Sequence, residues 1–367
     1  MFVFAALVLL QLVTGKTAYR YATLSAGLLY VAYGLLCFLV VQSLRATWQI
    51  KSLAACFSLY GLAVATFALL QGLASNGKLY WLRAPHGGGW IYGPYVNHNH
   101  YAGLMEMLFP IPLVFSLTSY AKGGIRRVAI LAAALMATTI FLSGSRGGMV
   151  SFFCQIIFFL AMLLGRQSRV PIRGRMALVF FAVIFISLLA WIGGNKLTER
   201  LMNTNSAKTE LSQDLRLQID RDLLRMFPHR PLLGWGLGTF ADVYPQYRSF
   251  YTTFYLDEAH NDYLQLLIET GAAGFLAMIW FLSLVFHASA KKLRNWTTDI
   301  DGAVTLAAML GIVGILVHSL VDFNLQVPAN AALFYVLCTV AAMEPRFSPG
   351  HALNAKHYSR ASFGSAM

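Results

Sequence analysis

The sequence predicts an all-α fold, a polytopic bundle of membrane-spanning helices. Of the 367 residues, 57% are hydrophobic and only 12% are charged, and the mean hydropathy is +0.60, so there is too little charged surface to cover a water-soluble globule of this size. Apolar stretches long enough to cross a hydrocarbon core about 30 Å thick follow one another along the chain. Basic residues gather in alternate connections between those stretches.

The apolar stretches predict about ten spans. In chain order they cover residues 2–14, 22–41, 52–72, 101–119, 127–142, 147–164, 176–193, 262–289, 302–320 and 329–343. The first stretch is short, but it lacks the basic n-region and A-x-A cleavage site of a signal peptide, so we expect it to remain as a span. The chain then divides into spans within 1–193 with an outer loop at 73–100, a large outer loop at 194–261, spans within 262–343, and a tail at 344–367.

Charge predicts how the bundle is oriented. The connections on one side, together with the tail, hold the basic residues Arg45, Lys51, Lys122, Arg126, Arg127, Arg166, Arg169, Arg173, Arg175, Lys291, Lys292, Arg294, Arg346, Lys356 and Arg360. The short connections on the other side hold only Lys16, Arg20, Lys78, Arg83 and Arg146. The positive-inside rule therefore places both termini in the cytoplasm, and we expect the chemistry in the two outer loops. The net charge of +13 does not indicate nucleic-acid binding, because no stretch combines basic residues with a recognisable reading module.

The large outer loop predicts an amphipathic helix at the membrane surface, because DLRLQIDRDLLRMF (214–227) places apolar residues at helical spacing. Ion pairing within this helix, such as Asp222 with Arg225, explains most of its charges. Arginine in preference to lysine nonetheless suits bidentate binding of phosphate, and the arginines concerned are Arg216, Arg221 and Arg225. The following PLLGWGLGTF lacks the spacing of a dinucleotide fingerprint and predicts a tight turn back to the membrane.

Arg146 lies in LSGSRGGM at the outer end of two apolar stretches, where the charge rule gives no reason for a cation. A snorkelling or salt-bridged arginine explains it as well as a functional one does. The small residues around it let a backbone approach a ligand and expose N–H groups, so the segment is a candidate cradle for phosphate.

The segment EAHNDYLQLLIETG opens a span at its outer end, where Asn261 or Asp262 can cap the helix. His260 is placed there as a candidate general base, and the alternative is a capping or interfacial histidine. Glu269 lies two helical turns beyond Asp262 on the same face. An acid inside the membrane is costly, so we expect Glu269 to face the bundle interior or a wet cavity.

Polar residues also stand at the start of one span and the end of another. Asn97, His98, Asn99 and His100 precede the fourth stretch, and helix capping or hydrogen bonding to sugar hydroxyls explains them better than a metal does, because no acid or Cys cluster lies nearby. Asp322 lies at the outer end of the ninth stretch, and an arginine is its candidate partner.

Four segments, in this order and over roughly residues 80–340, resemble the O-antigen ligase and polymerase family: S-x-S-R-G-G, R-L…P-L-L-G-W-G-L-G-x-F, H-N-D-Y-L-Q-x-x-x-E-x-G and D-F-N-L-Q-V-P-A-N. The resemblance implies an inverting, metal-independent glycosyltransferase with a GT-C-like helical fold and no cofactor. It would act on undecaprenyl-pyrophosphate-linked glycan at the periplasmic face of the bacterial inner membrane.

Residue roles follow from the resemblance only by position. Arg146 and Arg216 match the arginines that bind the pyrophosphate, and His260 matches the histidine that activates the acceptor hydroxyl. A less close match covers Asn97, Asn99, Arg221, Arg225 and Asp322. With fewer spans than the family commonly has, the chain is either a compact member or begins at a misplaced initiation codon.

Several functions stay open within the family: a ligase passes the glycan to lipid A core, a polymerase joins repeat units, and a third group glycosylates proteins. The single long outer loop late in the chain, with one H-N motif, fits a ligase at least as well as a polymerase, and we expect ligase-type transfer. A transporter of lipid-linked glycan is the alternative from another class, but such proteins often have paired halves or broken helices near the midplane, which the sequence does not indicate.

Overall fold

The computed structural model describes residues 2–84, 90–164, 170–202, 213–252, 255–293 and 296–343. Over these ranges the chain is helical, and its only β contacts are two isolated bridges. The predicted all-α class is therefore confirmed. The predicted tail at 344–367 lies outside the described residues.

Eight helical segments are long and apolar enough to cross a membrane. They are α2 (Arg20–Ser43), α3 (Thr47–Leu73), α4 with α5 (His98–Leu108 and Pro110–Leu117), α6 (Gly123–Ser143), α7 (Arg146–Leu164), α8 (Ile172–Met202), α11 (Asp262–Lys292) and α12 (Ile300–His318). The other two predicted spans are shorter apolar helices, α1 (Phe2–Val13) and α13 (Pro328–Ala342). The protein is thus a multi-pass membrane protein with eight full-length candidate spans among its described residues.

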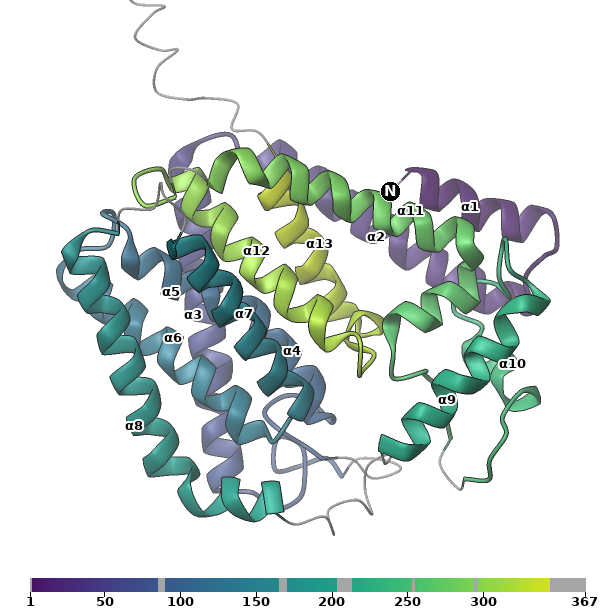
Figure 1. Cartoon of the computed structure of the whole chain (residues 1–367), viewed down its shortest axis with the longest axis horizontal. Coiled ribbons are helices and arrows are strands. Elements are labelled where there is room, and N and C mark those ends of the chain that lie inside the picture. Colours follow the sequence, from purple (N-terminus) through teal and green to yellow (C-terminus); the bar gives the residue numbers. More distant parts are fainter. Residues whose placement is uncertain are drawn as a thin grey trace, which may run out of the picture.

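The centre of the bundle is α12, which contacts α3, α4, α5, α7, α11 and α13. In Figure 1, α12 and α13 lie between a group that holds α3, α6, α7 and α8 and a group that holds α1, α2 and α11. The α4–α5 segment and α12 are mostly buried by other helices, whereas α2 and α8 turn most of their apolar surface outward. Lipid is the solvent that such outward apolar faces require.

The predicted amphipathic helix is α9 (Gln213–Met226), which packs against α11. Three residues of its apolar face, Ile219, Leu223 and Met226, are fully buried in a small core that also takes in the short helix α10 (Phe240–Val243). Figure 1 shows α9 and α10 together at the side of the molecule where α11 begins. This small core fixes α9 and α10, which belong to the described part of the large outer loop, against the start of α11.

A break in α11 at Gly271 explains the glycine-rich turn. Gly271 has a φ of 64°, and a Cβ there would lie 2.3 Å from the carbonyl oxygen of Leu232. The peptide N–H of Ala272 instead donates to Pro231 O at 2.8 Å, and the N–H of Trp235 donates to Ile268 O at 2.9 Å. The tight turn expected for PLLGWGLGTF is confirmed, and the break in α11 is what receives it.

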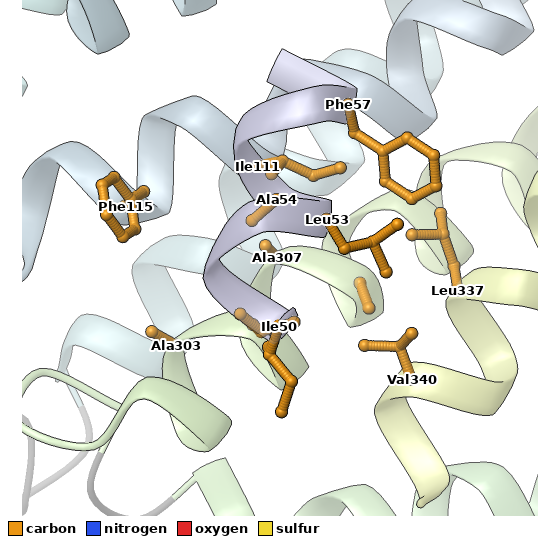
Figure 2. Close-up of a pocket in the computed structure, with 12 residues that line it drawn as sticks. Ile50, Leu53, Ala54, Phe57, Ile111, Phe115, Ala303, Ala307, Leu337 and Val340 are labelled. Atoms are coloured by element: carbon orange, nitrogen blue, oxygen red, sulfur yellow. The ribbon is translucent and has the colours of Figure 1, made fainter. Parts of the chain in front are cut away.

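An apolar cavity of about 30 Å³ lies between α3, α5, α12 and α13. Figure 2 shows that only hydrocarbon side chains, such as Ile50, Phe115 and Val340, point into it. The lining residues contributed by α12, such as Ala303, lie in its first half. The cavity is therefore at the opposite end of α12 from His318. A site for acid–base chemistry needs polar groups, and this cavity has none in its lining.

Candidate functional site

His260 stands immediately before α11, where Asn261 is the N-cap and accepts the N–H of Leu264 at 3.2 Å. The sequence allowed either Asn261 or Asp262 to be the N-cap, and in the structure it is Asn261. His260 has a φ of 56°, a left-handed conformation that is uncommon outside glycine and is found where surrounding structure fixes it. Its Nδ1 lies 3.2 Å from Oδ1 of Asp322, and 15% of the side chain is exposed.

Asp322 is fully buried and lies against two histidines, while the nearby arginine, Arg216, binds the adjacent Val321 carbonyl rather than the carboxylate. His100 Nε2 lies 4.0 Å from its Oδ1, and the ring of Phe323 packs edge-on against both imidazoles. Burial alone would raise the pKa of the Asp322 carboxyl, but the hydrogen bond from His260 and the charges of His260 and Arg216 hold this pKa well below its usual range. Asp322 is therefore an ionised carboxylate.

An ionised Asp322 selects one tautomer of His260. A carboxylate only accepts hydrogen bonds, so the proton of the neutral imidazole stays on Nδ1. The lone pair is then on Nε2. A histidine held in this way can take a proton from a hydroxyl that reaches Nε2, as in the pairing of an aspartate with a histidine base in hydrolases.

Arg216 of α9 reaches the same segment. Its Nη1 donates to the carbonyl of Val321 at 2.8 Å, next to Asp322 in the chain. Asn261 Nδ2 also donates to Asp220 Oδ1 at 3.4 Å, so α9 is tied to both sides of the His260–Asp322 pair. Burial raises the pKa of the Asp220 carboxyl, and its contact with Asn261 lowers it in part. The structure thus brings Arg216, Asn261, His260 and Asp322 together.

The side chains of the other predicted arginines are more exposed than that of Arg216. Arg146 is the first residue of α7, exposed, and makes no hydrogen bond or ion pair with the described part of the chain. Arg221 and Arg225 are exposed on α9. Arg225 Nη1 lies 3.8 Å from buried Asp222 while its own side chain is 74% exposed, so the intrahelical pair expected from the sequence is present. Within the described ranges, neither arginine makes a hydrogen bond or ion pair with His260 or Asp322.

The remaining polar candidates hold backbone in place. Asn97 is the N-cap of α4 and accepts the N–H of Asn99 at 2.8 Å. Asp262 Oδ2 accepts the Ser319 hydroxyl at 2.8 Å and the Leu325 N–H at 3.0 Å, which fastens α11 to the segment after α12. Glu269 is buried in the interior, as expected, and its carboxylate accepts the N–H groups of the glycine-rich turn: Gly238 at 2.8 Å and Phe240 at 3.2 Å.

Sequence reasoning missed a second buried cluster beside this site. Glu106 Oε1 lies 2.9 Å from His318 Nδ1, and His318 Nε2 lies 3.4 Å from the hydroxyl of Ser145. Neither Glu106 nor His318 was singled out as a functional candidate from the sequence. The sequence did contain a signal for Glu106. It is an acid inside an apolar span, and ionisable groups in such spans usually face a partner.

Residues 131–279 match the family model described as O-Antigen ligase. The matched range contains Arg146, Arg216 and His260, while Asp322 lies beyond it. The comparison with curated proteins gives no match. A domain of this family implies a glycosyltransferase-like enzyme of ligase or polymerase type, with glycan and lipid substrates. The match, found on a multi-pass helical membrane protein, supports the assignment of this chain to the O-antigen ligase and polymerase family.

Proposed function

We propose that the protein is an O-antigen ligase that moves a glycan from undecaprenyl pyrophosphate to a hydroxyl of lipid A core. The observation that carries the proposal is the His260–Asp322 pair at 3.2 Å, with Arg216 bound to the adjacent Val321 carbonyl. A base beside a fixed guanidinium suits a reaction in which one proton is removed while a phosphate group leaves. The family match supports glycan transfer in general.

The site faces the periplasm of the bacterial inner membrane in this proposal, and both termini are cytoplasmic. His260, Arg146 and Asp322 stand at the start of α11, the start of α7 and the end of α12. The described basic residues of the predicted cytoplasmic set lie at the other helix ends, such as Arg45 after α2 and Lys292 at the end of α11. The positive-inside rule supports this sidedness.

His260 acts on the acceptor. Its Nε2 takes the proton of the acceptor hydroxyl as the oxygen bonds to the anomeric carbon of the glycan, and Asp322 stabilises the imidazolium that forms. The bond from that carbon to the pyrophosphate oxygen breaks on the opposite face of the sugar, so the configuration inverts. Two helix caps support this step. Asn97 caps α4, which carries His100, and Asn261 caps α11, which begins directly after His260.

The arginines act on the donor. Negative charge grows on the pyrophosphate as it leaves, and the guanidinium groups at the membrane surface stabilise that charge without a metal. Arg216 is the best-held of these groups, and Arg146 is exposed at the N-terminus of a helix, where the backbone dipole also favours an anion. Arg221 and Arg225, exposed on α9, bind the outer part of the same pyrophosphate. Asp262 and Glu269 support the site by holding its backbone, and Asn99 supports it from its buried position in the first turn of α4.

A reconstitution tests the proposal. Purified protein in vesicles receives undecaprenyl-pyrophosphate-linked glycan with either lipid A core or a second lipid-linked glycan as acceptor, with and without a chelator. We expect transfer to lipid A core that is insensitive to the chelator, and no transfer by His260→Ala or Arg216→Ala. Chain extension would instead identify a repeat-unit polymerase. Transfer that stops with the chelator and returns with added metal would overturn the metal-free step, and transfer to neither acceptor would overturn the proposal for a ligase.

A further inference from the structure

The buried cluster of Glu106, His318 and Ser145 joins three helices. Glu106 belongs to α4, His318 ends α12, and Ser145 directly precedes α7. His318 Nδ1 lies 2.9 Å from Glu106 Oε1, and its Nε2 lies 3.4 Å from Ser145 Oγ. All three side chains are at most 1% exposed. Because a buried polar group without a partner is costly, these groups hold one another in a fixed arrangement.

Two glycines let α7 begin directly against this cluster. A Cβ at Gly147 would lie 2.6 Å from Cδ2 of His318, and a Cβ at Gly148 would lie 3.0 Å from Glu106 Oε1. Any larger side chain would therefore push the helix away from α12 and α4. The S-R-G-G segment is explained by this close approach, and its backbone does not need a ligand to account for the small residues.

The cluster resembles the serine, histidine and acid of a hydrolase, but it cannot act as one. Ser145 Oγ already accepts the N–H of Gly148 at 3.1 Å, which makes it the cap of the first turn of α7. It is also fully buried, so no substrate carbon can reach it. The neighbouring residue Arg146, by contrast, is exposed.

The backbone of His318 links the same cluster to the base. Its carbonyl oxygen accepts the N–H groups of Val321 at 3.0 Å and Asp322 at 3.2 Å. The side chain of His318 thus reaches towards the helix of Arg146, while its main chain holds the turn that carries Asp322. One residue connects the two halves of the proposed site.

We propose that Glu106, His318 and Ser145 are positioning residues that fix the first turn of α7, and through it hold Arg146 towards the pyrophosphate of the donor. This inference rests on the proposed function, because it assigns Arg146 to the donor. The cluster touches no reacting atom. Its effect is therefore expected through Arg146 alone, as a rise in the KM for the donor, together with whatever fall in kcat Arg146→Ala itself produces.

A double-mutant cycle tests the inference. Ser145→Ala removes the cap and leaves the helix apolar contacts in place, so we expect the donor KM to rise about fivefold. In an Arg146→Ala background the same change should have no further effect on KM, because the group being positioned is gone. Ser289→Ala is the matched control: it removes an equally buried hydroxyl from the far part of α11, where Ser289 Oγ donates to Val285 O, and should leave the donor KM unchanged.

The outcomes separate this inference from the proposed function. If Arg146→Ala leaves the donor KM unchanged, the assignment of Arg146 to the donor is wrong and the inference falls with it. If Arg146→Ala raises KM but Ser145→Ala raises it equally in both backgrounds, the proposed function stands and the positioning role is wrong. Glu106→Gln, which keeps an acceptor for His318, provides a second variant; retained folding with an unchanged donor KM for both Glu106→Gln and Ser145→Ala would also overturn the inference.

Discussion

Replacing Asp322 by Asn removes one buried charge while keeping the shape of the side chain. In the structure Asp322 Oδ1 accepts His260 Nδ1 at 3.2 Å and the N–H of Phe323 at 2.8 Å, and the Asn oxygen can keep both contacts. What is lost is the carboxylate charge that stabilises His260 once it has taken the proton. Opposite charges about 4 Å apart in a protein attract by about 4 kcal/mol at an effective dielectric of about 20. Since about 1.4 kcal/mol changes a rate tenfold, kcat should fall about 10³-fold.

The assay is the initial rate of glycan transfer by reconstituted protein at saturating donor and acceptor. Asp299→Asn is the matched control, because Asp299 caps α12 at its opposite end and Asn is an equally good cap. This control should transfer at the wild-type rate. A well-folded Asp322→Asn protein with wild-type kcat would refute the role of the carboxylate in the proton transfer.

Three further predictions follow from individual contacts. Gly271→Ala should destabilise the protein by about 2–4 kcal/mol, measured by thermal unfolding in detergent, because its Cβ meets Leu232 O and its φ is left-handed; an unchanged melting temperature would contradict the break in α11. Arg216→Ala should weaken donor binding more than Arg225→Ala does, because the Arg225 side chain is 74% exposed and only its ion pair with Asp222, at 3.8 Å, holds it; equal losses of donor affinity would contradict the placement of the pyrophosphate near Arg216. Burial raises the pKa of the Glu258 carboxyl to about 8, so the folded protein binds this proton more tightly than the unfolded chain and loses stability as the pH rises from about 4 to about 8. The melting temperature of Glu258→Gln relative to wild type should therefore be higher at about pH 8 than at about pH 5, and a difference independent of pH would contradict it.

The spans were predictable because the length and polarity of an apolar run are local properties of the chain. The sequence did not predict that the fourth span would divide at Phe109, where Pro110 begins α5, or that α11 would break at Gly271. Both breaks depend on packing. Around Gly271 the broken helix exchanges backbone hydrogen bonds with a turn more than thirty residues earlier in the chain. A local sequence pattern cannot predict such a long-range contact.

The residue types at the candidate site were also predictable, but their partners were not. The positive-inside rule and the helix start were enough to single out Arg146 and His260 on one face. Asp322 was expected to meet an arginine, yet its contact is with His260, and Arg216 binds the peptide carbonyl next to it. The Glu106–His318 pair joins residues 212 positions apart in the chain, so only the packing of α4 against α12 brings it together.

The most direct test of the account measures donor binding and glycan transfer in the same His260→Ala preparation. If His260 is the base and the arginines hold the donor, the variant binds undecaprenyl-pyrophosphate-linked glycan with wild-type affinity and loses transfer by at least about 10²-fold. Arg216→Ala, measured in parallel, should lose donor affinity. Transfer by His260→Ala at the wild-type rate, or a loss explained entirely by weaker donor binding, would contradict the central claim that this histidine activates the acceptor.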